Sequence, residues 1–274
     1  MNRNAIARLV IYCILAAVLT GILADGLNRD DSAWAPGEGG TAVTGMVSIE
    51  TAPIRRIQIE WVDGNVGIAT ADQDTITFSE TNGEKQCMVY QIKGDTLVIR
   101  YSKESIKLGI NIKTPEKHLT VHVPKDWIAE DIEVTAVSAN VTVDLPEARE
   151  TEIETVSGDI SIRYARSGEI SLTTVSGQVT FDGICEELDC SSVSGNCKVT
   201  LLGSAKQISM ESISGDLEIV LDGQSGFTAQ LDSVSGRIIS DFPTSINGQT
   251  HTYGDGSIRI EAETVSGGIR IRNA

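Results

Sequence analysis

The sequence is poor in aromatic residues, proline and histidine. Aromatic residues make up 4% of the 274 positions, and the chain has 6 prolines and 3 histidines. The scarcity of aromatic side chains argues against a bulky globular core and leaves isoleucine, valine and leucine to supply the apolar content. These residues favour thin, regular β layers. A chain of this length suits one long body or two small ones.

Positive charge is also scarce. Lysine and arginine number 22 against 38 aspartates and glutamates, which gives a formal net charge of −16. This balance argues against nucleic acid as a partner. The excess of acid suits solubility outside a cell, and it also suits recruitment of cations or basic partners. The simplest interpretation is that the charge keeps the protein soluble.

An apolar run near the N-terminus predicts a membrane anchor. Residues 9–24 read LVIYCILAAVLTGILA, with Arg3 and Arg8 before them. The basic flank places the N-terminus in the cytoplasm. We predict a signal anchor, a single transmembrane helix, over residues 1–24, followed by a flexible linker over 25–45. The rest of the chain is then extracytoplasmic, and it is secreted if the segment is cleaved as a signal peptide.

A Ser/Thr-Val/Ile-Ser-Gly motif recurs through the second half of the chain. Successive copies lie 18 to 21 residues apart, except that 31 residues separate the last two. A weaker copy, AVSA, contains Ser138. We predict that the motif marks structural corners, and that its serines and glycines are scaffold rather than site. These residues are Ser157, Gly158, Ser176, Gly177, Ser194, Gly195, Ser214, Gly215, Ser235, Gly236, Ser266 and Gly267.

The columns around the motif serine predict the fold. Positions six and four before it, and three and five after it, are almost all aliphatic, which is the alternation of two half-buried strands. The residue directly before the serine is also aliphatic, so we expect the inward phase to shift there through a bend or bulge. Stacked repeats of this kind predict an all-β chain with a β-solenoid of about seven rungs. An antiparallel sandwich of hairpins is the alternative.

We place the β-solenoid repeat domain at residues 128–274 and an N-terminal β module at 46–127. Residues 57–68 fit the repeat columns with Asp63-Gly64 at the corner, as a degenerate first copy. The alternating runs that begin at 74, 95 and 118 predict longer, hairpin-like strands. No helix is predicted after the anchor.

The cysteines and histidines suggest no metal or cofactor. Cys190 and Cys197 fall in aliphatic columns near Cys185, so we predict small buried apolar side chains, with a disulfide among the three left open. His118 and His122 share one face of a strand but lie about 13 Å apart along it, too far for one metal ion.

We predict no enzymatic activity. The motif serines far outnumber the histidines that might activate them, and their hydroxyls suit hydrogen bonds to turn backbone. The residue two after each serine forms a column of turn-forming residues, and no paired-carboxylate motif is visible. A glycan-cleaving β-helix enzyme is therefore the least favoured alternative.

Several segments together resemble a bacterial adhesin-like family of unknown function with β-strand repeats and SGDI-type corners. These are the N-terminal anchor, IQIEWVDGNVGI, LTVHVP, TVSGDISI and the closing YGDGSIRIEAETVSGGIRI. The likeness spans about residues 50–274. It implies an envelope-exposed β-solenoid without established catalysis, and it supplies no functional residues to carry over.

Three functional hypotheses follow. The first is a membrane-anchored adhesin-like protein that presents an acidic face to an envelope protein or glycan. The second is an accessory sensor of cell-envelope stress, whose short cytoplasmic tail would need a membrane partner to relay the signal. The third is a scaffold that self-associates through the end of the solenoid, where an unpaired rung invites pairing.

Overall fold

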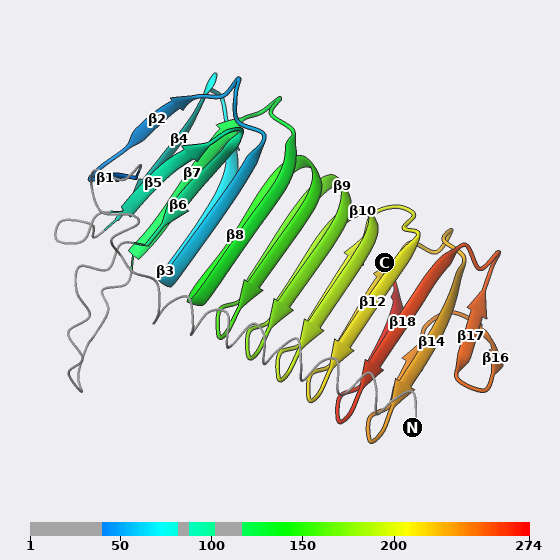
Figure 1. The fold of residues 1–274 in the computed structure, drawn as a ribbon. Helices are drawn as coiled ribbons and strands as arrows, with labels where there is room; N and C mark the ends of the chain where they lie inside the picture. Colours follow the sequence, from blue (N-terminus) through cyan, green and yellow to red (C-terminus); the bar gives the residue numbers. More distant parts are fainter. Residues whose placement is uncertain (1–39, 82–87, 102–116) are drawn as a thin grey trace, which may run out of the picture.

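The computed structural model describes residues 40–81, 88–101 and 117–274, and the regular elements in these ranges are all β-strands (Figure 1). The predicted anchor and residues 25–39 of the predicted linker lie outside the described residues. Within the described ranges no helix is long and apolar enough to cross a membrane. The strands are β1 Thr41–Val43, β2 Val47–Glu50, β3 Arg56–Ala71, β4 Thr75–Glu80, β5 Met88–Lys93, β6 Thr96–Arg100, β7 Lys117–Pro124, β8 Ala129–Thr155, β9 Ile160–Thr174, β10 Val179–Ser192, β11 Cys197–Leu201, β12 Gln207–Ser212, β13 Leu217–Leu221, β14 Phe227–Ser233, β15 Ile238–Ser240, β16 Ser245–Asn247, β17 Thr250–Tyr253, β18 Ile258–Thr264 and β19 Ile269–Asn273.

Each repeat supplies one strand segment before its Ser-Gly corner and one segment after it, and in β8, β9 and β10 a single strand bends from the segment after one corner to the segment before the next. We call the layer of strands before the corners the first sheet and the layer after them the second sheet. Strands of successive repeats pair in parallel and in register, so that Ile160 of β9 lies between Val141 of β8 and Val179 of β10. Equal spacing keeps the apolar columns aligned and buries them between the two sheets. The repeats therefore form a solenoid-like body, and the antiparallel sandwich is wrong for this region.

The order of the rungs in space differs from their order in the chain. Strand β18 pairs with β12 on one side and with β14 on the other, and β19 lies in the same way between β13 and β15. Figure 1 shows β18 between β12 and β14. The last copy of the motif is thus the penultimate rung. The unpaired rung at this end is therefore formed by β14 and β15, because the long segment before the last copy carries the chain back as the β16–β17 hairpin.

The degenerate first copy is a rung. Strand β3 pairs in parallel with β8, with Asp63 opposite Ser138. On its other side β3 pairs in parallel with β6 and β7, which supply a further rung before it. The predicted hairpin is present between β5 and β6, which are antiparallel around Gly94, where φ is 64°. Strand β7, in contrast, joins the solenoid in parallel with β3 and pairs antiparallel only with β4.

One part of the predicted linker is ordered as a strand. Residues Thr41–Val43 form β1, which pairs antiparallel with β5. Val43 packs against the core. Because this side chain is partly buried, the ordered β structure begins before residue 46, the predicted start of the N-terminal β module.

Aromatic side chains gather at the two ends of the apolar core. The rings of Trp61 and Tyr101 meet edge to face at 5.3 Å between centroids at the N-terminal end, and those of Phe227 and Phe242 do so at 5.3 Å at the C-terminal end. The aliphatic columns are narrow and would by themselves leave the two ends of the core exposed. Large aromatic rings cover these ends. Beyond β19, the terminal strand β15 exposes 37% of Ile238 and 44% of Ile239.

Candidate functional site

The repeated corner is closed by the first hydroxyl of the motif. In the copy at 174–177, the buried Thr174 Oγ1 accepts a hydrogen bond of 2.9 Å from the Gly177 N–H. The same contact recurs in five further copies, made by Thr155, Ser192, Ser212, Ser233 and Thr264.

The inward phase therefore continues to the residue two before the serine. The valine directly before the serine is only half-buried in most copies, as at Val175. The prediction that the phase shifts at this aliphatic residue is wrong, because a hydroxyl can close the turn and a valine cannot.

The corner glycines are required by the spacing between rungs. A Cβ placed on Gly177 would lie 1.8 Å from the Gly158 carbonyl oxygen, and one on Gly195 would lie 1.7 Å from that of Gly177. Neither glycine has a positive φ. Close backbone approach, and not a left-handed conformation, excludes other residues here.

The motif serines and the residues after the glycines form two exposed ladders. Ser194 Oγ donates to the Val175 carbonyl of the adjacent rung at 3.2 Å. In the second ladder, Asp159 Oδ1 accepts from the Gln178 N–H at 2.8 Å. Hydrogen bonds from these groups join neighbouring rungs, and none of these side chains lies beside a general base.

The outer face of the first sheet is acidic. Its outward side chains recur at the same three strand positions, so that carboxylates from successive rungs stand about 4.8 Å apart along the sheet. Glu211 of β12, for example, lies directly opposite Glu263 of β18. We call this the acidic face, and its members are Glu60, Asp131, Glu133, Glu150, Glu152, Glu154, Glu169, Glu187, Asp189, Glu211, Asp232, Glu261 and Glu263.

Burial and neighbouring charges raise the pKa of several carboxyl groups on the acidic face. Partial burial raises the pKa of Glu154, and the neighbouring carboxylates Glu152 and Glu133 raise it further. Burial and then the charge of Glu263 do the same for the pKa of Glu211. Like charges held in register disfavour the ionised form. The pKa values of Asp131, Glu133 and Asp189 are also raised, in each case chiefly by burial.

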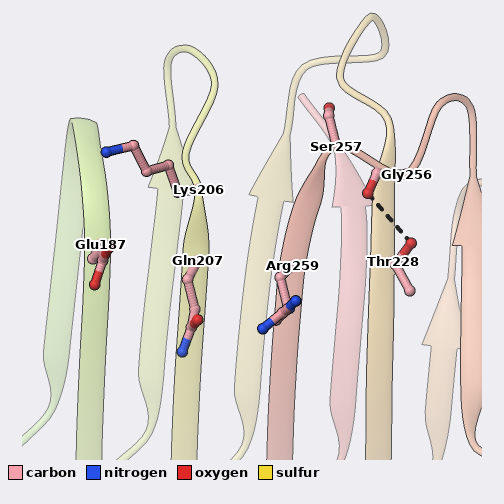
Figure 2. Close-up of a pocket in the computed structure, with 7 residues that line it drawn as sticks. All are labelled: Glu187, Lys206, Gln207, Thr228, Gly256, Ser257 and Arg259. Atoms are coloured by element: carbon pink, nitrogen blue, oxygen red, sulfur yellow. Dashed lines mark hydrogen bonds between the residues drawn. The ribbon is translucent and has the colours of Figure 1, made fainter.

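A groove runs beside the acidic face, where the chain returns from the second sheet to the first. It consists of two adjoining hollows of about 710 and 440 Å³ that share Glu187 and Lys206. Figure 2 shows the smaller one, in which Gln207 and Arg259 lie on neighbouring strands and Thr228 Oγ1 donates to the Gly256 carbonyl. The larger hollow extends toward Arg56 past the bends at 146–149, 165–168 and 184–186, where β8, β9 and β10 pass from the second sheet to the first.

Carboxylates and cations both line the groove. Lys206 Nζ binds Glu186 at 2.5 Å, and this contact lowers the pKa of Glu186 and raises that of Lys206. Arg149 and Arg166 also line the groove, yet within the described ranges neither has a carboxylate within 4.0 Å. Arg166 is paired in register with Glu147, and its charge contributes to the lowered pKa of Glu186, so charges of both signs alternate along this side of the groove.

The cysteines and histidines form no metal centre in the described part of the chain. Cys185, Cys190 and Cys197 are buried free thiols, as predicted from their place in the aliphatic columns, and no disulfide joins them. Burial raises the pKa of the Cys185 thiol to about 12, which leaves it inert. His118 bonds the Asn65 side chain at 3.0 Å.

The structure contains a buried ion pair that was not predicted from the sequence. Lys117 Nζ lies 3.2 Å from Glu80, with both side chains 0% exposed, and it also lies 4.4 Å from the centre of the Tyr101 ring. The Glu80 carboxylate accepts a further bond of 2.6 Å from the Met88 N–H. Both residues continue the inward alternation of their strands, Lys117 in β7 and Glu80 in β4, so the period of two was the available signal of their burial.

Solved structures of similar shape come from several bacteria. A Bacteroides fragilis protein provisionally described as an adhesin shares 14% identity over 86% of this chain and 98% of its own, with a TM-score of 0.49. A Clostridium sporogenes protein provisionally described as a cell adhesion protein shares 14% over 85% and 100%, with a TM-score of 0.39. A Parabacteroides distasonis protein provisionally described as lipid-binding shares 14% over 85% and 100%, with a TM-score of 0.41.

No curated protein sequence matches the chain significantly. A family model does, twice, over residues 54–187 and 147–272, and together these matches span most of the chain and nearly all of the solenoid. The chain belongs to the Toastrack DUF4097 family.

Proposed function

We propose that this protein is a non-catalytic, adhesin-like scaffold held at the bacterial cell envelope, and that it binds cationic partners through the acidic face. The observation that carries the proposal is the stacking of carboxylates in register on this face, where burial and then the charges of neighbouring carboxylates raise the pKa of Glu154 and Glu211. A partner that brings positive charge relieves the repulsion among these carboxylates, and this relief contributes favourably to the free energy of binding.

The groove and the corners support binding over catalysis. The repeated geometry of each corner is used by hydrogen bonds within and between rungs, and neither histidine nor cysteine lines the groove. The apolar run at residues 9–24 would anchor the body at the membrane with the acidic face outside. An envelope protein with a basic surface, or an amine-bearing glycan, has the chemistry that this face selects.

Binding of octalysine to the full chain tests the proposal. Two variants remove equal charge from opposite sides of the body, Glu152→Gln/Glu154→Gln on the acidic face and Asp144→Asn/Asp182→Asn on the second sheet. At about 0.5 kcal/mol for each exposed ion pair, the first variant should weaken binding roughly fivefold. The second should change it less than about twofold.

Added salt should weaken binding to the wild type, because the attraction is between exposed charges. Equal losses in the two variants would show that octalysine senses net charge only, and would overturn the assignment to this face. Fractionation of cells that express the chain tests the anchoring separately, and recovery of the uncleaved protein from the cytoplasm would contradict it.

A further inference from the structure

The two sheets stop at different places at the C-terminal end of the solenoid. In the first sheet, β17 pairs with β14 and β16 pairs with β17, so this sheet continues for two strands beyond the last rung. Figure 1 shows this hairpin beyond β14. In the second sheet, β15 pairs with β19, and within the described ranges no strand pairs with its other side. The second sheet is therefore shorter than the first by two strand spacings, or about 10 Å.

The shorter sheet leaves inward apolar side chains uncovered. Ile246 of β16 lies opposite His251 of β17, which lies opposite Ala229 of β14. Paired residues share one face of a sheet, and Ala229 is fully buried, so Ile246 points to the inner side, yet it is 63% exposed. Ile238 of β15 is 37% exposed, although its neighbour Ile269 on β19 is fully buried. We call Ile238, Ile246 and the free edge of β15 the end surface.

The free edge of β15 offers backbone hydrogen bonds. The Arg237 C=O and the Asp241 N–H each form a bond of 2.9 Å with β19. Successive residues of a strand direct their backbone groups to opposite sides, so the N–H and C=O groups of Ile238 and Ser240 face away from β19. No backbone group in the described part of the chain pairs with them. Another extended backbone supplies donors and acceptors at the matching spacing.

A second copy of the solenoid cannot stack end to end here. Such a dimer would continue both sheets and would place the β14 strands of the two copies side by side. Strand β17 already occupies this position along Phe227–Gln230. A single extended strand, in contrast, needs only the edge of β15, and its inward side chains would cover Ile246.

The charge beside this edge selects the strand further. Arg237 is exposed, and within the described ranges it has no carboxylate within 4.0 Å. The residue beside it on β19 is Gly268, which brings no charge. An acidic residue opposite Arg237 in an added strand would therefore form a cross-strand ion pair.

We infer that the end surface binds an extended segment of a partner protein, which adds to β15 as an antiparallel strand. Its alternate aliphatic side chains face inward over Ile238 and Ile246, and an acidic residue lies opposite Arg237. The antiparallel direction gives the more stable ladder for a given length. This inference goes beyond the proposed function, since it uses no residue of the acidic face, and the failure of either leaves the other standing.

The peptide Thr-Ile-Thr-Ile-Glu, with both ends blocked, is the probe. In the antiparallel register its glutamate lies opposite Arg237, and its isoleucines lie opposite Ile238 and Ser240. The isoleucine N–H groups then point to β15, and the threonine N–H groups point away. In titrations with the full chain, N-methylation of both isoleucines should weaken binding at least about tenfold, and N-methylation of both threonines less than about twofold.

Two variants with equally exposed side chains assign the binding to the end surface. Ile246→Ser should weaken binding at least about threefold, because the peptide's isoleucines lose apolar contact. Leu202, 62% exposed, follows β11, three rungs from β15, and Leu202→Ser should leave the affinity unchanged. The absence of binding to the wild type, equal affinities of the two methylated peptides, or binding that Ile246→Ser leaves intact would each overturn the inference. Dimers that form through this end and displace the peptide would also overturn it, because a second copy would then be the occupant.

Discussion

Substitution of Thr174 by valine tests the hydroxyl that closes the corner. Thr174 is 0% exposed, and its Oγ1 accepts the Gly177 N–H at 2.9 Å. Valine preserves the volume and removes the acceptor, so the glycine N–H is left buried without a partner. Such a loss costs about 1–3 kcal/mol. For a body of this size it should lower the thermal midpoint by about 2–10 °C.

The matched control is Ser176→Ala in the same corner. Ser176 is exposed, and its Oγ donates to the Val156 carbonyl at 3.4 Å, so water can replace it. Its loss should cost less than about 0.5 kcal/mol. Circular dichroism during thermal and denaturant unfolding measures both variants. If Ser176→Ala proved as damaging as Thr174→Val, the closing role assigned to the first hydroxyl would be wrong.

Three further perturbations probe separate features. Gly177→Ala forces a Cβ to within 1.8 Å of the Gly158 oxygen and should cost at least about 2 kcal/mol in unfolding free energy, whereas Gly67→Ala, whose Cβ would meet nothing closer than 3.9 Å, should cost less than about 1 kcal/mol; equal costs would refute the close approach. Lys117→Met strands a buried carboxylate and should destabilise by about 3–5 kcal/mol in denaturant titrations, and an unchanged midpoint would contradict the buried pair. Asp216, whose pKa is lowered by the Gly268 N–H and by Arg270, stabilises the fold above its unfolded pKa, so the small deficit of Asp216→Asn at neutral pH should vanish as the pH falls through the folded pKa; a constant deficit would exclude this linkage.

The periodic part of the fold could be predicted because it repeats. Alternating aliphatic positions around each serine predicted the paired strands, and the match of residues 57–68 to the same columns predicted the rung formed by β3. An irregular residue in one copy is outweighed by the regular residues in the others, so the aligned columns are more informative than any single segment.

The order of the rungs could not be predicted from the same columns. Every copy presents a similar edge, so the pattern does not distinguish β18 inserted between β12 and β14 from β18 added at the end. The 31-residue spacing before Ser266 was the available signal, since only a long connection lets the chain pass over a rung.

The candidate site was predictable only in outline. Composition indicated an acidic surface, but the register that stacks Glu211 against Glu263 is a property of the assembled sheet. The groove joins turns that are far apart in sequence, and Arg149 and Arg166 carry no motif. Charge spread over many repeats becomes a surface only when the fold places it on one side.

The thermal midpoint of the full chain as a function of pH tests most directly whether burial and charge repulsion on the acidic face destabilise its ionised carboxylates. The raised pKa values mean that the folded state binds more protons than the unfolded state, so stability should increase as the pH falls from 7 toward about 5, still above the unfolded carboxyl values near 4. Added salt at pH 7 should have the same sign of effect. We expect the midpoint to rise over this interval at low ionic strength, and to rise less in Glu152→Gln/Glu154→Gln. A midpoint that falls steadily from pH 7 to 5 would contradict the repulsive face, and with it the proposed binding of cationic partners.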